Sequence, residues 1–115
     1  MRAAAAYVET RRLPGESVVF QIPYLRHTYE YYAGPLQTAV DGRFTNGGST
    51  SEQVADEMAA AVGDAPVVWL VLSEEDMWDS RGLVRHWLEG HGQRADDQKF
   101  QRVEVTRFQM GKVDK

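Results

Sequence analysis

Residues 23–32 contain the side chains best suited to contact with a ligand. They follow an apolar segment, and their aromatic and cationic members are Tyr24, Arg26, Tyr29, Tyr31 and Tyr32. Aromatic rings beside a guanidinium suit sugar rings or phosphates, because the rings stack and the guanidinium pairs with anions. The segment therefore predicts a binding surface. In the alternative interpretation, Tyr29 and Tyr32 pack a helix onto a sheet and the other tyrosines cover the surface.

A second group of polar side chains follows the apolar run of residues 67–72. The predicted binding residues from this region are Ser73, Trp78 and Arg81. Acidic residues at positions 74, 75, 76 and 79 could act as a general acid and base if burial separated their pKa values. A dense acidic run at a helix start more commonly compensates the helix dipole. Ser73, with Asp76 three residues later, fits a helix cap better than a nucleophile.

No motif for catalysis or cofactor binding accompanies these groups. The first apolar strand leads into Pro23-Tyr24 instead of a G-x-G-x-x-G turn, and neither a P-loop nor a G-x-S-x-G motif occurs. His86 and His91 are five residues apart and would not share a helix face, and His27 is isolated. The absence of cysteine excludes disulfides and thiolate metal sites. We therefore predict no catalytic residue, no metal and no cofactor.

Length and composition restrict the protein class further. A chain of 115 residues with 43% hydrophobic residues is typical of one domain, so we expect residues 1–115 to form a single soluble α/β domain. The net charge of −4 and the scattered arginines argue against nucleic acid as a partner. No apolar run approaches the roughly 18 residues that a membrane span needs.

The elements that would position these residues alternate between helical and strand patterns. We expect helices near residues 2–12, 24–32, 50–63 and 74–90. We expect strands near residues 18–22, 36–40, 66–72 and 100–108. This order predicts a three-layer α/β/α sandwich with a small, mostly parallel four-stranded sheet, Rossmann-like or flavodoxin-like but without a phosphate-binding fingerprint.

Three local features make this prediction specific. The unbroken apolar runs 18–22 and 67–72 predict neighbouring strands that are covered on both faces. The tyrosine-rich segment would then emerge at their carboxyl ends, where ligands bind in open α/β sheets. Thr50 and Gln53 predict a capping box, and partial alternation in residues 100–108 predicts an edge strand with one wet face.

A family resemblance extends over most of the chain. The segments that carry it are Arg2-Ala-Ala-Ala-Ala-Tyr7-Val8, Pro14-Gly15-Glu16-Ser17-Val18-Val19-Phe20, Pro23-Tyr24, Tyr31-Tyr32, Val68-Trp69-Leu70-Val71-Leu72-Ser73, Met77-Trp78-Asp79, Leu83-Val84, Trp87-Leu88, Phe100, Val103-Glu104-Val105 and Phe108. Together they resemble the carboxyl-terminal extracytoplasmic domain of bacterial multi-spanning glycosyltransferases of the dolichyl-phosphate-mannose protein mannosyltransferase type.

The resemblance implies an accessory role in a membrane enzyme that transfers a sugar from a polyprenyl-phosphate carrier. In that family the catalytic carboxylate lies in an external loop near the start of the membrane portion. The resemblance therefore implies no catalytic residue in this chain. Its expected partners are an upstream membrane-spanning catalytic portion and the acceptor or carrier headgroup. The first helix lacks a capping residue, which fits either a chain cut from a longer one or a frayed, uncapped terminus. The alternatives are a stand-alone small-ligand-binding module and a protein-interaction module.

Overall fold

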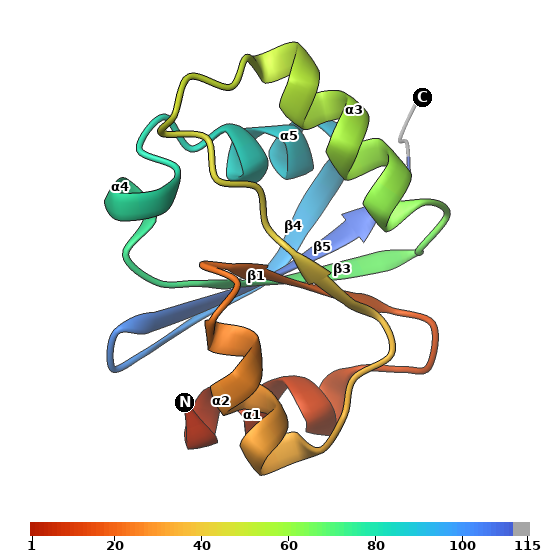
Figure 1. Cartoon of the computed structure of the whole chain (residues 1–115). Helices are drawn as coiled ribbons and strands as arrows, with labels where there is room; N and C mark the ends of the chain where they lie inside the picture. The colour runs from red at the N-terminus through yellow and green to blue at the C-terminus, as the bar shows by residue number, and fades with distance from the viewer. Residues whose placement is uncertain (112–115) are drawn as a thin grey trace.

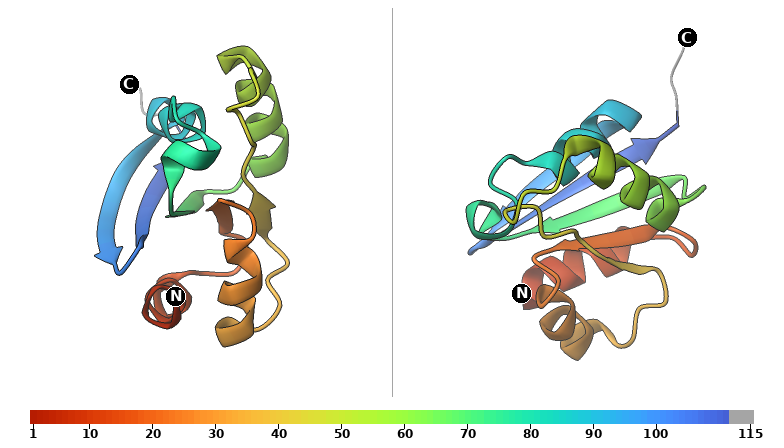
Figure 2. Two further views of the ribbon diagram at one scale, coloured as in Figure 1. Left: turned by 60° about the vertical axis from the view of Figure 1, so that its left-hand side comes forward. Right: turned by 45° about the horizontal axis from the view of Figure 1, so that its top comes forward.

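Five strands form one mixed sheet in the computed structural model, which describes residues 1–111. The order of the strands across the sheet is β2-β1-β3-β5-β4, and the right-hand view of Figure 2 shows β3 between β1 and β5. The strands are β1 (Ser17–Gln21), β2 (Ala39–Asp41), β3 (Val67–Leu72), β4 (Gly92–Phe100) and β5 (Val103–Met110). The pairs β1–β2 and β1–β3 are parallel, whereas β3–β5 and β4–β5 are antiparallel.

Helices lie on both faces of this sheet (Figure 1). They are α1 (Arg2–Arg11), α2 (Leu25–Ala33), α3 (Ser51–Val62), α4 (Glu75–Trp78) and α5 (Leu83–His91). Residues of α1 and α2 share one apolar cluster with the sheet, and residues of α3 and α5 share the other. No helix within residues 1–111 is long and apolar enough to cross a membrane.

The central pair of strands agrees with the prediction from the apolar runs. β1 and β3 lie side by side in parallel, and every residue of both strands is buried. Successive side chains point to opposite faces, so Val18 and Phe20 pack toward α1 and α2 while Val19 packs toward α3 and α5. Because both faces bury apolar side chains, neither strand shows polar alternation.

The predicted four-stranded, mostly parallel sheet in a three-layer sandwich is wrong. The sheet has five strands, and half of its strand pairs are antiparallel. The missed strand is β4, whose mostly polar and exposed sequence carries no apolar period. A short turn at Gln101 and Arg102 joins β4 to β5, with Arg102 in the left-handed region at φ 65°. β5 therefore lies inside the sheet, and β4 is the edge strand.

Helix boundaries were partly predictable. The Thr50–Gln53 capping box is confirmed, since both reciprocal hydrogen bonds are present at the start of α3. The predicted cap at Ser73 is wrong, because Glu74 occupies the cap position in the left-handed region and makes no side-chain cap bond. The single helix expected over residues 74–90 is divided into α4 and α5.

Truncation of a central side chain tests this account of the core. Leu70→Ala should lower the free energy of unfolding by about 3 kcal/mol, because Leu70 is buried between the sheet and the α3–α5 layer. Urea denaturation measures the change. Leu13→Ala is the matched control: Leu13 is 64% exposed, so its truncation should change stability by less than about 0.5 kcal/mol. Equal losses in the two variants would contradict the assignment of the core.

Candidate functional site

The carboxyl ends of β1 and β3 lie at the same edge of the sheet, as parallel neighbours require. Four connections meet this edge: residues 22–24, 42–50 and 73–74, and the β4–β5 turn at 101–102. Figure 1 shows α4 and the β4–β5 turn at this same side of the molecule. In open α/β sheets such an edge is where ligands bind, so its side chains are the first candidates for function.

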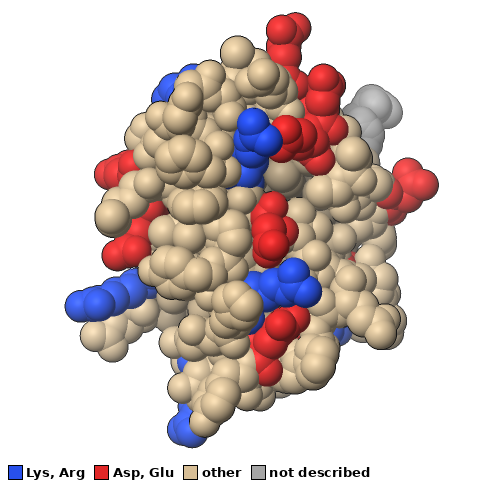
Figure 3. All heavy atoms as spheres, in the orientation of Figure 1, with Lys and Arg blue, Asp and Glu red and all other residues tan. Residues whose placement is uncertain are grey.

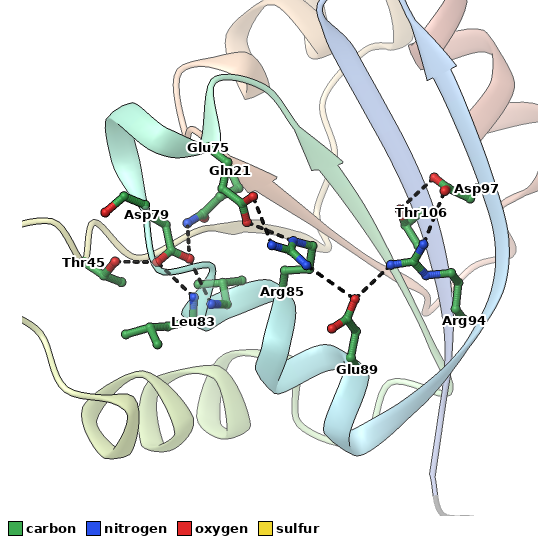
Figure 4. A network of polar contacts seen from close by, with 12 residues as sticks. Gln21, Thr45, Glu75, Asp79, Leu83, Arg85, Glu89, Arg94, Asp97 and Thr106 are labelled. Carbon is green, nitrogen blue, oxygen red and sulfur yellow. Dashed lines mark hydrogen bonds and ion pairs between the residues drawn. The ribbon is translucent and has the colours of Figure 1, made fainter.

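A buried carboxylate, Asp79, organises the connections at this edge (Figure 4). It accepts hydrogen bonds from the Thr45 hydroxyl and from Gln21 Nε2, the latter at 3.3 Å. It also accepts the backbone N–H groups of Leu83 and Val84, each at 3.0 Å, at the start of α5. Asp79 thus ties β1, the 42–50 loop and α5 together. With four donors on its oxygens, it is a scaffold group.

The side chain of Gln21 passes close to the backbone of the 42–50 loop. Its Nε2 donates to the Arg43 carbonyl at 3.2 Å as well as to Asp79. A Cβ atom at Gly42 would lie 1.6 Å from Gln21 Oε1 and 2.8 Å from the fixed carbonyl oxygen of Phe20, so glycine allows the loop to approach β1 this closely. The loop position therefore depends on the absence of a side chain at residue 42.

Two of the predicted binding residues instead hold this same loop. Arg81 donates from Nη2 to the carbonyl oxygens of Thr45 at 2.8 Å and Ser49 at 2.5 Å. Trp78 donates from Nε1 to the Gly42 carbonyl at 3.2 Å, and its ring meets that of Phe44 edge-on with centroids 4.9 Å apart. Nη2 of Arg81 and Nε1 of Trp78 are therefore engaged within the chain.

An open pocket of about 430 Å³ lies at the carboxyl end of β3, between α4 and the β4–β5 turn. We call it the carboxyl-edge pocket; it is lined by Leu72, Ser73, Glu74, Glu75, Asp76, Lys99, Phe100, Arg102, Val103 and Glu104. Ser73 is buried, whereas Glu74 stands exposed above it. The lining combines four carboxylates with two cations and the ring of Phe100, a mixture that suits a polar ligand with both hydrogen-bonding and charged groups.

A chain of ion pairs supports one wall of the carboxyl-edge pocket (Figure 4). Arg85 pairs with Glu75 at 3.0 Å and with Glu89 at 3.6 Å. Arg94 continues the chain, pairing with Glu89 at 2.9 Å and with Asp97 at 3.4 Å. These pairs link α4, α5 and β4 in sequence. Each partly exposed pair contributes little stability, but together they fix Glu75 against α5.

Glu104 is the carboxyl group of the pocket whose titration the fold alters. Burial raises the pKa of Glu104, and the neighbouring carboxylate of Asp97 raises it further. Lys99, its cross-strand partner, and Arg94 act in the opposite direction and do not cancel the rise. Glu104 therefore holds a proton to higher pH than an ordinary glutamate.

The tyrosine-rich segment does not form one surface. Tyr29 is buried and donates to Glu9 on α1, so it packs α2 against its neighbours as in the alternative interpretation. Burial and the Glu9 carboxylate together raise the pKa of Tyr29. Tyr24 lies at the carboxyl edge, 56% exposed, and donates to Glu74 at 3.2 Å.

The remaining predicted side chains lie elsewhere on α2. Tyr31 and Tyr32 are exposed toward its carboxyl-terminal end. Arg26 is held by Glu30 at 3.2 Å and Asp41 at 3.7 Å. The structure therefore brings Tyr24 and Ser73 to the carboxyl edge and places Tyr31 and Tyr32 on a different surface.

The sequence alone did not predict the pocket residues that come from β4, β5 and the turn between them. Lys99, Arg102 and Glu104 reach it only because β5 runs antiparallel to β3 and the turn after β4 lies beside the end of β3. The strand at 92–100 has no periodic signal that could have placed Lys99. Glu104 lies in a segment that was expected to be a strand, but its face was unknown without the partner strand.

These features define an α/β domain with a mixed sheet and an open polar pocket at its carboxyl edge. Within residues 1–111, no group of three or more histidine, aspartate or glutamate side chains could hold a metal ion. No family model matches the chain, and no curated protein or solved structure is significantly similar to it. Figure 3 shows acidic and basic side chains interspersed on the viewed face, without a large area of one sign.

Removal of the Asp79 carboxylate should disorganise the carboxyl edge. Asp79→Ala should lower the free energy of unfolding by about 3 kcal/mol, because four donors lose a charged acceptor. It should also speed amide exchange in residues 42–50. Asp76→Ala is the control, since Asp76 is exposed and should change stability by less than about 0.5 kcal/mol. Unchanged exchange in the loop would contradict the scaffold role.

The raised pKa of Glu104 predicts a pH-dependent stability. Between its ordinary value of 4.5 and its raised native value, the folded protein binds more protons than the unfolded chain, so stability falls as pH rises through this window. Glu104→Gln should remove that fall and stabilise the protein relative to wild type above the window but not below it. Denaturant titrations from pH 4 to 8 measure the free energy of unfolding of the variant and of the wild type. Asp97→Asn should also make the fall in stability with rising pH smaller. A constant difference across the range would refute this assignment.

Proposed function

We propose that this chain is a non-catalytic accessory domain of a membrane glycosyltransferase that moves a sugar from a polyprenyl-phosphate carrier. In this proposal the domain lies on the extracytoplasmic side of the membrane. Its partners are the membrane-spanning catalytic portion and the acceptor or the carrier headgroup. The carboxyl-edge pocket is the surface that contacts that ligand.

The observation that carries the proposal is that two different sets of residues at the carboxyl edge hold the loops and line the open pocket. Both carboxylate oxygens of Asp79 accept hydrogen bonds within the chain, and Arg81 binds two backbone carbonyls through Nη2. The open pocket is lined by carboxylates and an aromatic ring, which suit the hydroxyls and the ring of a sugar, and by Lys99 and Arg102, which suit a phosphate. Hydrogen-bonding and charged groups around an open pocket are suited to positioning a ligand for chemistry performed elsewhere.

The resemblance in sequence gives further support. Its segments 17–20 and 68–73 lie in the central strand pair, and segment 77–79 supplies Trp78 and Asp79, which hold the 42–50 loop. Glu104 and Phe100 line the pocket. These residues behind the resemblance build the carboxyl edge and its support, whereas Arg2 to Val8 and Tyr31-Tyr32 lie on or beside the two amino-terminal helices.

A protein-interaction module is the second candidate. Large apolar side chains are exposed at the same end of the sheet: Tyr24, Phe44 at 44% and Met77 at 70%. Exposed aromatic and methionine side chains are enriched in protein interfaces. This candidate differs in its ligand, which would be a protein instead of a sugar phosphate.

Ligand binding by the purified chain tests the proposal. Mannose 1-phosphate should shift amide resonances of residues 72–76 and 99–104, with weak affinity because the pocket is open. Arg102→Gln should weaken binding by about fivefold or more, since a charge-assisted contact to phosphate is lost. Arg11→Gln is the control, because Arg11 lies on the exposed face of α1 and outside the pocket.

Two further measurements separate the parts of this proposal. The chain incubated with polyprenyl-phosphate-mannose and an acceptor should transfer no sugar, and transfer would overturn the non-catalytic role. The open reading frame that encodes the chain should also encode many apolar spans, and their absence would overturn the membrane enzyme. If mannose 1-phosphate leaves the pocket resonances unchanged, the role in positioning the headgroup falls.

A further inference from the structure

Two exposed tyrosines mark the carboxyl-terminal end of α2. Tyr31 is 80% exposed and Tyr32 45%, and their rings meet edge-on with centroids 5.0 Å apart. The guanidinium of Arg2 lies 5.7 Å from the centroid of Tyr32. We name these three residues the tyrosine–arginine patch. In Figures 1 and 2, α2 runs away from the sheet and the amino terminus lies beside it.

A pocket of about 530 Å³ adjoins the patch between α1 and α2. Its lining is Arg2, Ala5, Ala6, Glu9, Tyr32 and Ala33. Alanine methyl groups form an apolar floor, and Arg2 and Tyr32 stand at its edge. This arrangement offers a cation beside an apolar surface that is accessible from solvent.

The one carboxylate of this pocket is paired within the part of the chain that the structure describes, whereas the charge of Arg2 is not. Glu9, its one carboxylate, is bound by Arg12 at 2.9 Å and by the Tyr29 hydroxyl. Although burial alone would raise the pKa of Glu9, the hydrogen bonds from Arg12 and Tyr29 lower it overall, so this carboxylate stays ionised and paired. Within residues 1–111, Arg2 makes no ion pair with a carboxylate. Its charge is therefore available to a ligand.

The charge distribution along the chain also favours an anionic ligand at this end of the protein. Residues 1–33 carry four arginines and three glutamates, a net charge of +1, whereas the whole chain carries −4. The two amino-terminal helices thus belong to a stretch of small net positive charge in an otherwise acidic protein. Tyrosine rings with an apolar body and a polar tip favour the boundary between lipid and water, and arginine favours anionic headgroups.

We propose that the tyrosine–arginine patch docks on the surface of a bilayer that contains anionic lipids, with Arg2 facing a lipid phosphate. This inference rests on the proposed function, in which the chain before Arg2 would leave the membrane next to this patch. The apolar floor of the α1–α2 pocket would accept the upper part of an acyl chain. Tyr31 and Tyr32 would lie at the level of the headgroups.

Flotation of the chain with lipid vesicles tests the docking surface. The protein should float with vesicles of phosphatidylcholine and phosphatidylglycerol at low salt, and much less with phosphatidylcholine alone. Arg2→Gln should weaken binding by about fivefold, the loss expected for one cation near an anionic surface. Tyr31→Ser combined with Tyr32→Ser should weaken it at least as much, and both variants should unfold at the wild-type denaturant concentration.

Tyr24→Ser provides the matched control. Tyr24 is as exposed as Tyr32 but lies at the other end of α2, so its loss should leave vesicle binding unchanged. No binding by the wild-type chain, or equal loss with Tyr24→Ser, would overturn the proposal. If inorganic phosphate binds to Arg2 but vesicles do not, the phosphate that Arg2 recognises does not belong to a lipid, and the proposal is overturned.

The failure of the docking surface and the failure of the proposed function can be distinguished. If the reading frame encodes no membrane spans and vesicle binding still depends on the patch, the proposed function fails while the docking surface stands. If the spans are present and the vesicles are not bound, the docking surface alone fails.

Discussion

The parallel pairing of β1 with β3 is the constraint on which the rest of the structure depends. Both strands are buried over their whole length, so each must find hydrogen-bond partners on both sides and apolar cover on both faces. β2 and β5 supply the partners, and the pairs α1–α2 and α3–α5 supply the cover. Because parallel strands end at the same edge, this pairing also gathers the connecting loops where a ligand can reach them.

Those loops are held by polar groups that the sheet itself provides. Gln21 ends β1 inside the protein, and its amide binds Asp79 and the Arg43 carbonyl. Asp79 in turn replaces a conventional cap for α5, since the cap residue Gly82 has no side chain to offer. A buried carboxylate is costly without donors, and its four donors come from three different elements. The order of the carboxyl edge is therefore a consequence of how α5 begins.

The predictability of the fold follows the physical strength of each signal. The central strands could be predicted because burial on both faces leaves an unbroken apolar run, and the start of α3 because its capping box is a local contact. β4 could not, since an edge strand with mostly polar, exposed residues has no period to detect, and its partner β5 then appeared to be an edge. Because β4 was not predicted, Lys99 and Arg102 could not be assigned to the carboxyl-edge pocket. Only the pocket residues that follow β3 could be expected at this edge.

For the tyrosine-rich segment, prediction from the sequence was limited by the geometry of the helix. Sequence proximity grouped Tyr24 with Tyr31 and Tyr32, but seven to eight residues of helix separate their positions by about 10–12 Å along its axis. Between them Tyr29 turns inward to Glu9, which Arg12 also binds, so α2 is locked to α1. A helix fixed in this way is a rigid spacer. If lipid were bound at one end and a carrier headgroup at the other, their separation would be set by α2, and the buried Tyr29 contact would be what keeps it constant.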